Sequence, residues 1–291
     1  MGASIAACTN PTCTRRDDRI DRSQPWSHCA SGTRVAEPYN LGVHPRFFAP
    51  EAQATGELIT LPEEEAEHLT RVLRLGAGAA VRVFNGSGDE FESVVEAAAK
   101  DGVRVRLGDA REPAPEPRLQ VTLAQAVLKG DKMDDVVRDA VMIGATAIRP
   151  ILTARTETTL AILEKGRRQE RWERVAISSA KQCGRAIVPP ILEPVTFDAF
   201  IAFLLAKWLA GPALMLVEPG ATKAAVTFAE LDVEPPKAAT VLVGPEGGWT
   251  PEEIEAAEAA CRRVTMGGRT LRADTMGLIA ISAIYSRWRE F

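Results

Sequence analysis

The sequence predicts an α/β protein in which a small β-rich module precedes a mostly parallel sheet with helices on both faces. Three observations support this fold class. Alternating polar and apolar residues surround Asn85-Gly86, which is a hairpin signal. The stretch "EPAPEP" (112–117) has the composition of a stiff linker. After this linker, apolar strand-like runs alternate with helical segments, as in parallel sheets.

Residues 1–43 are expected to form a disordered extension, because they are polar, rich in Pro and Gly, and show no apolar period. Cys8, Cys13 and Cys29 lie in this stretch together with His28. Their spacing matches no paired Cys-x-x-Cys motif, so we expect no metal site here.

The first module is expected to span residues 44–115 and to form a short β-barrel. One helix is predicted in it over 61–75, with Pro62 in the first turn and acidic residues near the positive end of the helix dipole. Its expected apolar stripe consists of Leu69, Val72, Leu73 and Leu75.

The second part, 116–291, is expected to contain the parallel sheet. Apolar runs predict strands over 119–128, 147–154, 213–219 and 239–248. Between and after them, helices are predicted over 132–145, 165–185, 197–211, 250–264 and 273–288, with Gly144 and Gly184 as C-terminal caps.

Composition places the chain among ordinary globular proteins. Its 291 residues are 46% hydrophobic and 25% charged, with a formal net charge of -4. Positive charge is nevertheless concentrated locally, since residues 165–185 hold seven basic and two acidic side chains. This local excess is compatible with an anionic partner. No apolar stretch is long enough to span a membrane and no secretory signal is visible, so the expected location is cytoplasmic.

A glycine-rich loop, "GPEGG" (244–248), follows the apolar run 239–243. Ligands in α/β sheets bind at the carboxyl ends of strands, and glycine lets the backbone approach them closely. Thr250 and Pro251 are typical of a helix start directly after the loop. A ligand-binding loop and a plain strand-to-helix turn fit these residues equally well.

A second glycine-rich stretch, "MGGRTLRADT" (266–275), combines two glycines, two arginines and a helix start. Arg269 and Arg272 could bind an anion or could simply be solvated. Asp274 or Thr275 could cap the following helix.

The chain resembles the RsmE family of ribosomal RNA uridine N3-methyltransferases, in the SPOUT superfamily. The residues that carry the resemblance occur in order over about 44–291. They are "HPRFF", "HLTRVLRL", "FNGSG", "KGDKMDDVVRDAVMIGATAIRPILTARTET", "RWERVAISSAKQCGRAIVPPI", "VLVGPEGGWTPEEIEAA" and "MGGRTLRADT".

The resemblance implies a PUA-like RNA-binding barrel over 44–115 and a SPOUT α/β domain over 116–291 with a deep trefoil knot. Periodicity alone would never predict a knot, because true knots are rare. The resemblance also implies a homodimer that binds S-adenosylmethionine in the loops of the knot. The implied cofactor-binding residues are Leu216, Val217, Glu218, Val243, Gly244, Pro245, Gly247, Gly248, Met266, Gly267, Leu271 and Thr275.

The implied reaction is methylation of N3 of a uridine in small-subunit (16S) ribosomal RNA, within a ribosomal particle. Arg272 is the leading candidate for stabilising the uracil anion, and Glu246 is the second catalytic candidate. The expected RNA-binding residues are Arg46, Arg71 and Arg74 in the barrel and Lys129, Lys132, Arg155 and Arg185 in the second domain. Two alternatives stay open: an enzyme of this fold that methylates a ribose 2′-hydroxyl or another base, and a non-catalytic RNA-binding protein.

Overall fold

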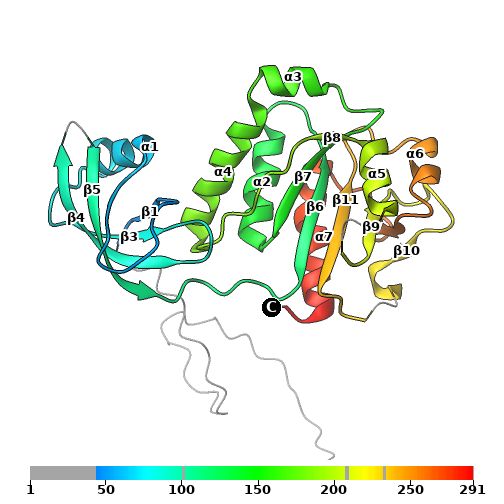
Figure 1. Cartoon of the computed structure of the whole chain (residues 1–291). Helices are drawn as coiled ribbons and strands as arrows, with labels where there is room; N and C mark the ends of the chain where they lie inside the picture. The colour runs from blue at the N-terminus through cyan, green and yellow to red at the C-terminus, as the bar shows by residue number, and fades with distance from the viewer. Residues whose placement is uncertain (1–43, 100–101, 207–209, 232–233, 291) are drawn as a thin grey trace, which may run out of the picture. The chain divides into compact units, whose positions relative to one another are not determined.

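The computed structural model describes residues 44–99, 102–206, 210–231 and 234–290 (Figure 1). The expected extension over 1–43, with Cys8, Cys13 and Cys29, lies outside these residues. Within the described part, no helix combines the length and the apolar character needed to cross a membrane.

The first sheet has five strands in the order β1-β3-β4-β5-β2. Their bounds are Arg46–Phe48 (β1), Leu58–Thr60 (β2), Ala80–Phe84 (β3), Glu90–Ala99 (β4) and Gly102–Arg111 (β5). Strand β1 runs parallel to β3, and the other pairs are antiparallel. Along β5, Val103, Val105 and Leu107 are buried while the residues between them are exposed. This period of two gives the small domain its apolar core.

The hairpin predicted at Asn85-Gly86 is confirmed, since β3 and β4 are antiparallel neighbours on either side of it. The buried Asn85 side chain accepts hydrogen bonds from the backbone N–H groups of Ser87 (2.9 Å) and Asp89 (3.1 Å). Gly86 has φ 81°, a conformation that favours glycine. The turn is therefore held by one asparagine side chain.

The helix predicted over 61–75 is shorter and less regular than expected. Helix α1 (Glu63–Glu67) continues as a π-helical segment, η1 (His68–Val72). A π-turn inserts one residue, which rotates the following side chains away from the helical face. Leu69 is buried and Leu75 packs against the core, but Val72 is 67% and Leu73 38% exposed, so the predicted apolar stripe is wrong at Val72 and Leu73.

The second sheet has seven strands in the order β10-β12-β9-β11-β6-β7-β8, and all neighbouring pairs are parallel. Their bounds are Gln120–Ala126 (β6), Ala147–Leu152 (β7), Val195–Thr196 (β8), Ala213–Leu216 (β9), Val226–Thr227 (β10), Ala238–Val243 (β11) and Arg262–Thr265 (β12). The predicted parallel sheet is confirmed.

Helices cover both faces of this sheet (Figure 1). One face packs against α2 (Lys132–Ile143), α4 (Arg168–Cys183) and α7 (Ala273–Trp288). The other packs against α5 (Phe197–Leu205) and α6 (Pro251–Ala256). Successive residues of β6 point to opposite faces, so that Leu123 belongs to the apolar core on the first face and Ala124 to the core on the second. The short helices α3 (Leu160–Lys165) and η2 (Phe228–Glu230) complete the described elements.

Helix ends follow the expected chemistry. Gly144 after α2 and Gly184 after α4 both adopt left-handed conformations, with φ of 106° and 90°. Thr250 caps α6 and forms a capping box with Glu253, and Pro251 occupies the first helical position. Helix α7 coincides with the predicted 273–288.

The helix predicted over 250–264 is wrong in its second half. Helix α6 ends at Ala256, and Arg262–Thr265 forms strand β12. Val264 of β12 pairs with Leu216 of β9 and is fully buried. Tertiary burial of this valine outweighs the helical preference of the alanine-rich stretch before it. The trefoil knot implied by the resemblance stays a prediction.

Candidate functional site

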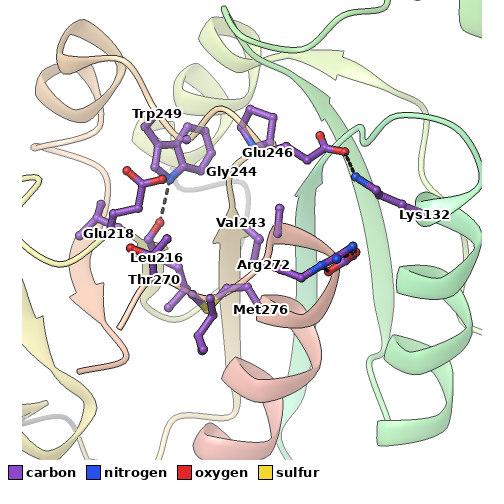
Figure 2. Close-up of a pocket in the computed structure, with 16 residues that line it drawn as sticks. Lys132, Leu216, Glu218, Val243, Gly244, Glu246, Trp249, Thr270, Arg272 and Met276 are labelled. Carbon is purple, nitrogen blue, oxygen red and sulfur yellow. Dashed lines mark hydrogen bonds and ion pairs between the residues drawn. The ribbon is translucent and has the colours of Figure 1, made fainter. Parts of the chain in front are cut away.

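Three loops meet at one edge of the parallel sheet. They follow β9, β11 and β12, which are adjacent strands with their carboxyl ends at the same edge. A cavity of about 370 Å³ lies among these loops, the start of α7 and Lys132 of α2 (Figure 2). Its volume is in the range of small-molecule sites. The lining residues are Lys132, Leu216, Val217, Glu218, Val243, Gly244, Pro245, Glu246, Gly248, Trp249, Thr270, Leu271, Arg272, Ala273, Asp274 and Met276.

Trp249 joins two of these loops. Its indole Nε1 donates a hydrogen bond of 2.7 Å to the carbonyl oxygen of Leu216, and the side chain is buried. A Cβ atom at Gly244 would lie 3.1 Å from the indole ring. Gly244 therefore serves the packing of Trp249, and Trp249 fixes the spacing between the loops after β9 and β11.

The two adjacent glycines face different surroundings. Gly248 has φ +70°, and a Cβ atom there would lie 2.5 Å from Oε1 of Glu218, inside the cavity wall. A Cβ atom at Gly247 would instead meet the side chain of Arg155 at 3.3 Å. Gly248 lines the cavity and Gly247 does not, and the expected approach of Gly247 to the cofactor stays a prediction.

Two ion pairs stand at the rim of the cavity. Lys132 Nζ lies 2.8 Å from Oε1 of Glu246, and Arg272 binds both carboxylate oxygens of Asp274. The hydrogen bond from Arg272 is the main reason why the pKa of Asp274 lies below its usual value. Burial by itself would raise the pKa of Glu246, but the hydrogen bonds from Lys132 and from backbone N–H groups outweigh it and lower that pKa. Both carboxylates are therefore ionised and weakly basic at neutral pH.

The structure brings together most of the residues expected to bind a cofactor. Those in the cavity wall are Leu216, Val217, Glu218, Val243, Gly244, Pro245, Gly248 and Leu271, together with both catalytic candidates, Glu246 and Arg272. Gly247, Met266, Gly267 and Thr275 are outside it. Met266 packs against the core, and the hydroxyl group of Thr275 donates a hydrogen bond to the carboxylate of Asp274.

Sequence reasoning missed five lining residues: Trp249, Thr270, Ala273, Asp274 and Met276. Trp249 directly follows the two glycines, and a large aromatic residue beside a glycine loop is a signal that could have been used. The others belong to a loop and a helix start whose side chains have no distinguishing pattern in the sequence.

A second cavity of about 590 Å³ lies on the other side of the 246–247 backbone. Its wall includes Lys129, Arg155 and Arg168, and it shares Glu246 with the first cavity. Arg155 donates a 2.6 Å hydrogen bond to the carbonyl oxygen of Gly247, and Lys129 pairs with Glu157. Trp172 also lines it, and the indole Nε1 of this buried residue has no acceptor among the described residues. The wall of this cavity therefore carries three cations, Lys129, Arg155 and Arg168, and two carboxylates, Glu157 and Glu246.

Of the five arginines expected to bind RNA, Arg155 lines the second cavity, and the other four divide into two groups. Arg71 is exposed and pairs with Glu67, and Arg74 is exposed with φ 56°. The side chains of Arg46 and Arg185 are only 8% and 6% exposed and bond to protein acceptors. For these two, burial contradicts the expected contact with RNA.

Comparison with known proteins agrees with this architecture. A family described as "RNA methyltransferase domain" matches residues 115–285, and one described as "RNA methyltransferase PUA domain" matches 61–108. A ribosomal RNA small subunit methyltransferase E from Synechocystis is 34% identical over 81% of this chain and 75% of its own.

Solved structures are similar as well. The same enzyme from Neisseria gonorrhoeae, bound to S-adenosyl methionine, has a TM-score of 0.73 and 30% identity, and the match covers 84% of this chain and 98% of that one. A methyltransferase from Legionella pneumophila, solved with its cofactor SAM, has a TM-score of 0.76 and 28% identity with the same coverage.

A PUA-like domain joined to a SPOUT-type α/β domain with a strand-end cavity defines a class of RNA methyltransferases. Within that class, the chain belongs to the ribosomal RNA small subunit methyltransferase E family.

Proposed function

We propose that this protein uses S-adenosylmethionine to methylate N3 of a uridine in small-subunit ribosomal RNA. The observation that carries the proposal is the cavity at the ends of β9, β11 and β12, with two cations at its rim. The family and its S-adenosylmethionine-bound relatives support the cofactor and the RNA. The choice of N3 rests on the resemblance of the motifs.

The cavity fits the cofactor chemically. Gly248 keeps the wall open at a point where a Cβ atom would collide with Glu218. The Glu218 carboxylate can accept hydrogen bonds from ribose hydroxyl groups. Leu216, Val243 and Met276 offer apolar surface for an adenine ring.

The chain's own residues would position the base and stabilise its charge. S-adenosylmethionine supplies an activated methyl group when it is bound. N3 of uracil must lose its proton before it can attack, and the ionised Glu246 and Asp274 are too weakly basic to remove it efficiently. Arg272, at the rim and 74% exposed, is placed to stabilise the uracil anion. We assign Glu246 the role of holding Lys132 at the same rim.

The RNA would reach this site across the second cavity. Lys129, Arg155 and Arg168 offer positive charge for the phosphates next to the target nucleotide. Arg71 and Arg74 are exposed on the PUA-like domain and remain candidates for more distant contacts. The proposal includes a homodimer that acts on a ribosomal particle in the cytoplasm, as the resemblance implies, with domains over 44–115 and 116–291.

The test is the identity of the product. Purified protein is incubated with S-adenosylmethionine and small-subunit particles that lack the modification, and the nucleosides are analysed by mass spectrometry. N3-methyluridine is the expected product. A 2′-O-methylated nucleoside or another methylated base would favour a different acceptor atom. Absence of any methylated product, with the RNA still bound, would favour the non-catalytic alternative.

A further inference from the structure

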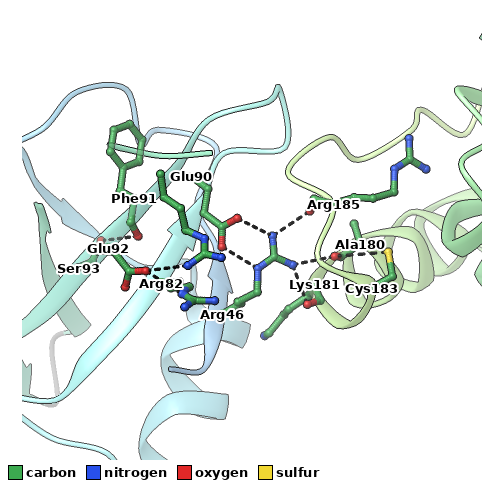
Figure 3. Close-up of polar contacts among 11 residues, drawn as sticks. Arg46, Arg82, Glu90, Phe91, Glu92, Ser93, Ala180, Lys181, Cys183 and Arg185 are labelled. Atoms are coloured by element: carbon green, nitrogen blue, oxygen red, sulfur yellow. Dashed lines mark hydrogen bonds and ion pairs between the residues drawn. The ribbon is translucent and has the colours of Figure 1, made fainter. Parts of the chain in front are cut away.

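Arg46 connects the PUA-like domain to the methyltransferase domain. It belongs to β1, and its guanidinium group lies between the carboxylate of Glu90 and the end of α4 (Figure 3). The side chain is 8% exposed and lies over the ring of Phe84, 4.5 Å from the centroid. This cation is therefore enclosed by groups from both domains.

Every N–H donor of this guanidinium has an acceptor. An arginine side chain carries five such donors. Nε and Nη2 bond to the two carboxylate oxygens of Glu90, at 2.9 Å and 3.3 Å. Nη1 donates to the carbonyl oxygens of Ala180 (2.8 Å) and Lys181 (2.7 Å), and Nη2 also donates to that of Arg185 (3.0 Å). No donor remains for a phosphate.

The acceptors on the methyltransferase domain are the carbonyl groups of Ala180 and Lys181, in the last turn of α4, and of Arg185, just beyond the helix. The Ala180 carbonyl also accepts the backbone N–H of the cap residue Gly184 (3.1 Å), and the helix dipole makes this end of α4 negative. A cation there is favourable, and its partner Glu90 is 3% exposed. Separation of the domains would remove three of the five hydrogen bonds that Arg46 donates, which is costly for a shielded ion pair.

Further contacts hold the same region, residues 180–188, which we call the interdomain segment. Lys181 Nζ lies 2.6 Å from the carboxylate of Glu65. Backbone hydrogen bonds run from Val188 N to Gly86 O (2.9 Å) and from Gly88 N to Ala186 O (3.3 Å). The interdomain segment is thus bound to the hairpin loop and to α1 of the first domain.

Arg185 extends these contacts into the methyltransferase domain. Its side chain pairs with Glu116, in the linker between the two sheets, at 2.9 Å and 2.6 Å. Its Nη1 also donates to the carbonyl oxygens of Val141 and Ala145 at the end of α2. The interdomain segment is therefore joined to the linker and to the core helix α2.

We propose that Arg46 is a positioning residue that fixes the PUA-like domain against the methyltransferase domain, so that RNA held by the first is presented to the cavity of the second. The role in RNA presentation rests on the proposed function. When two binding surfaces are held in a fixed geometry, RNA bound to one surface has a high effective concentration at the other. This advantage is lost when the two domains move independently.

The chain offers a matched control in Arg82. It is the register partner of Arg46 in β3, its side chain is 9% exposed, and it pairs with Glu92 at 3.0 Å. That pair lies within the PUA-like domain. Arg46→Gln and Arg82→Gln thus each remove a shielded guanidinium from the same sheet, but only the first removes bonds to α4. Arg46→Lys keeps the charge but has three donors instead of five.

The first readout is hydrogen exchange at the amides of Gly88 and Val188, which bond across the domains. In Arg46→Gln we expect these two amides to exchange faster than in the parent protein, while the exchange rates of the β6 and β11 amides stay the same. In Arg82→Gln we expect all of these rates to equal those of the parent protein. The second readout is the steady-state kinetics of RNA methylation.

The KM for the RNA should rise about tenfold or more in Arg46→Gln. Its kcat and S-adenosylmethionine affinity should stay within twofold of the parent.

Arg46→Lys should give intermediate values in both readouts, and it replaces Arg46→Gln if the latter does not fold. Unchanged exchange at Gly88 and Val188 would overturn the proposed fixation. Faster exchange with an unchanged KM, or an equal KM change in Arg82→Gln, would overturn the role in RNA presentation. Failure of the parent protein to methylate RNA would instead contradict the proposed function, and the exchange data would still decide whether Arg46 joins the domains.

Discussion

At the scale of single residues, a substitution of Arg272 tests the proposed chemistry most directly. It is the N-cap residue of α7 and lies at the rim of the cavity, bound to Asp274. That hydrogen bond raises the pKa of Arg272 further, so the group is always a cation. Such a cation can stabilise negative charge on a base, or it can merely hold the start of α7 through Asp274.

Arg272→Ala should lower the single-turnover methylation rate by about 10²–10³, the usual effect of losing a positioned charge. The rate is measured at saturating S-adenosylmethionine and saturating RNA. Arg269→Ala is the matched control, because Arg269 is exposed in the same loop but does not line the cavity. If Arg272→Ala methylates within a few-fold of the parent under these conditions, Arg272 has no chemical role.

Cys261 gives a prediction for pH dependence. Burial raises the pKa of this thiol to about 12, although the charge of Arg263 opposes the shift. Between pH 9 and pH 12 the unfolded chain loses this proton while the folded chain keeps it. Stability from this group is therefore complete below pH 9 and falls as the pH rises toward 12, by at most about 1.4 kcal/mol per pH unit.

The measurement is urea unfolding at pH 8 and at pH 10.5. Cys261→Ala, which has no thiol to ionise, should lose less stability between the two pH values than the parent. Equal losses in the two proteins would show that Cys261 ionises as readily in the folded protein as in the unfolded chain.

At the scale of elements, the loop after β11 has two faces. Gly248 borders the first cavity, and Gly247 faces Arg155. Gly248→Ala places a methyl group 2.5 Å from Glu218 at a φ of +70°, which strains the backbone and displaces that side chain. We expect S-adenosylmethionine affinity to fall by about tenfold or more, since the strain of about 1–3 kcal/mol falls on the binding loop.

Calorimetric titration with S-adenosylmethionine measures this affinity. Gly247→Ala is the control, because its methyl group would contact the movable side chain of Arg155 at 3.3 Å. Similar affinities in the two variants would contradict the assignment of Gly248 to the cofactor wall.

Elements with strong local signals were predictable, and elements set by tertiary contacts were not. Gly144 and Gly184 mark helix ends through their left-handed conformation, and Thr250 and Pro251 mark a start. Strand β12 has only four residues, and its pairing with β9 depends on an order of strands that no local pattern encodes. The π-helical segment at His68–Val72 likewise has no sequence signature here.

The same distinction applies to the site. The glycine loop at a strand end pointed to a ligand, but only the strand order β12-β9-β11 brings the three loops together. Charge alone could not separate the exposed Arg71 from Arg46, because both are arginines in the first domain. Their burial differs because Arg46 faces the carboxyl end of α4.

At the scale of the whole molecule, the two sheets lie on either side of the linker, with β5 ending at Arg111 and β6 beginning at Gln120. The predicted division at 115/116 falls between them and stays a prediction, as do the knot and the homodimer. The family places both sheets in one enzyme, and the contacts of Arg46 and Arg185 join them. We therefore expect RNA binding and methyl transfer to depend on the two domains as one joined unit.

The most direct test of this account is a map of methylated nucleotides in small-subunit ribosomal RNA from cells with and without the protein. We expect one N3-methyluridine to be present in the first and missing in the second. It should return with the parent protein and fail to return with Gly248→Ala or Arg272→Ala. An unchanged set of N3-methyluridines in cells that lack the protein, or loss of a methyl group from a ribose or another base, would contradict the account.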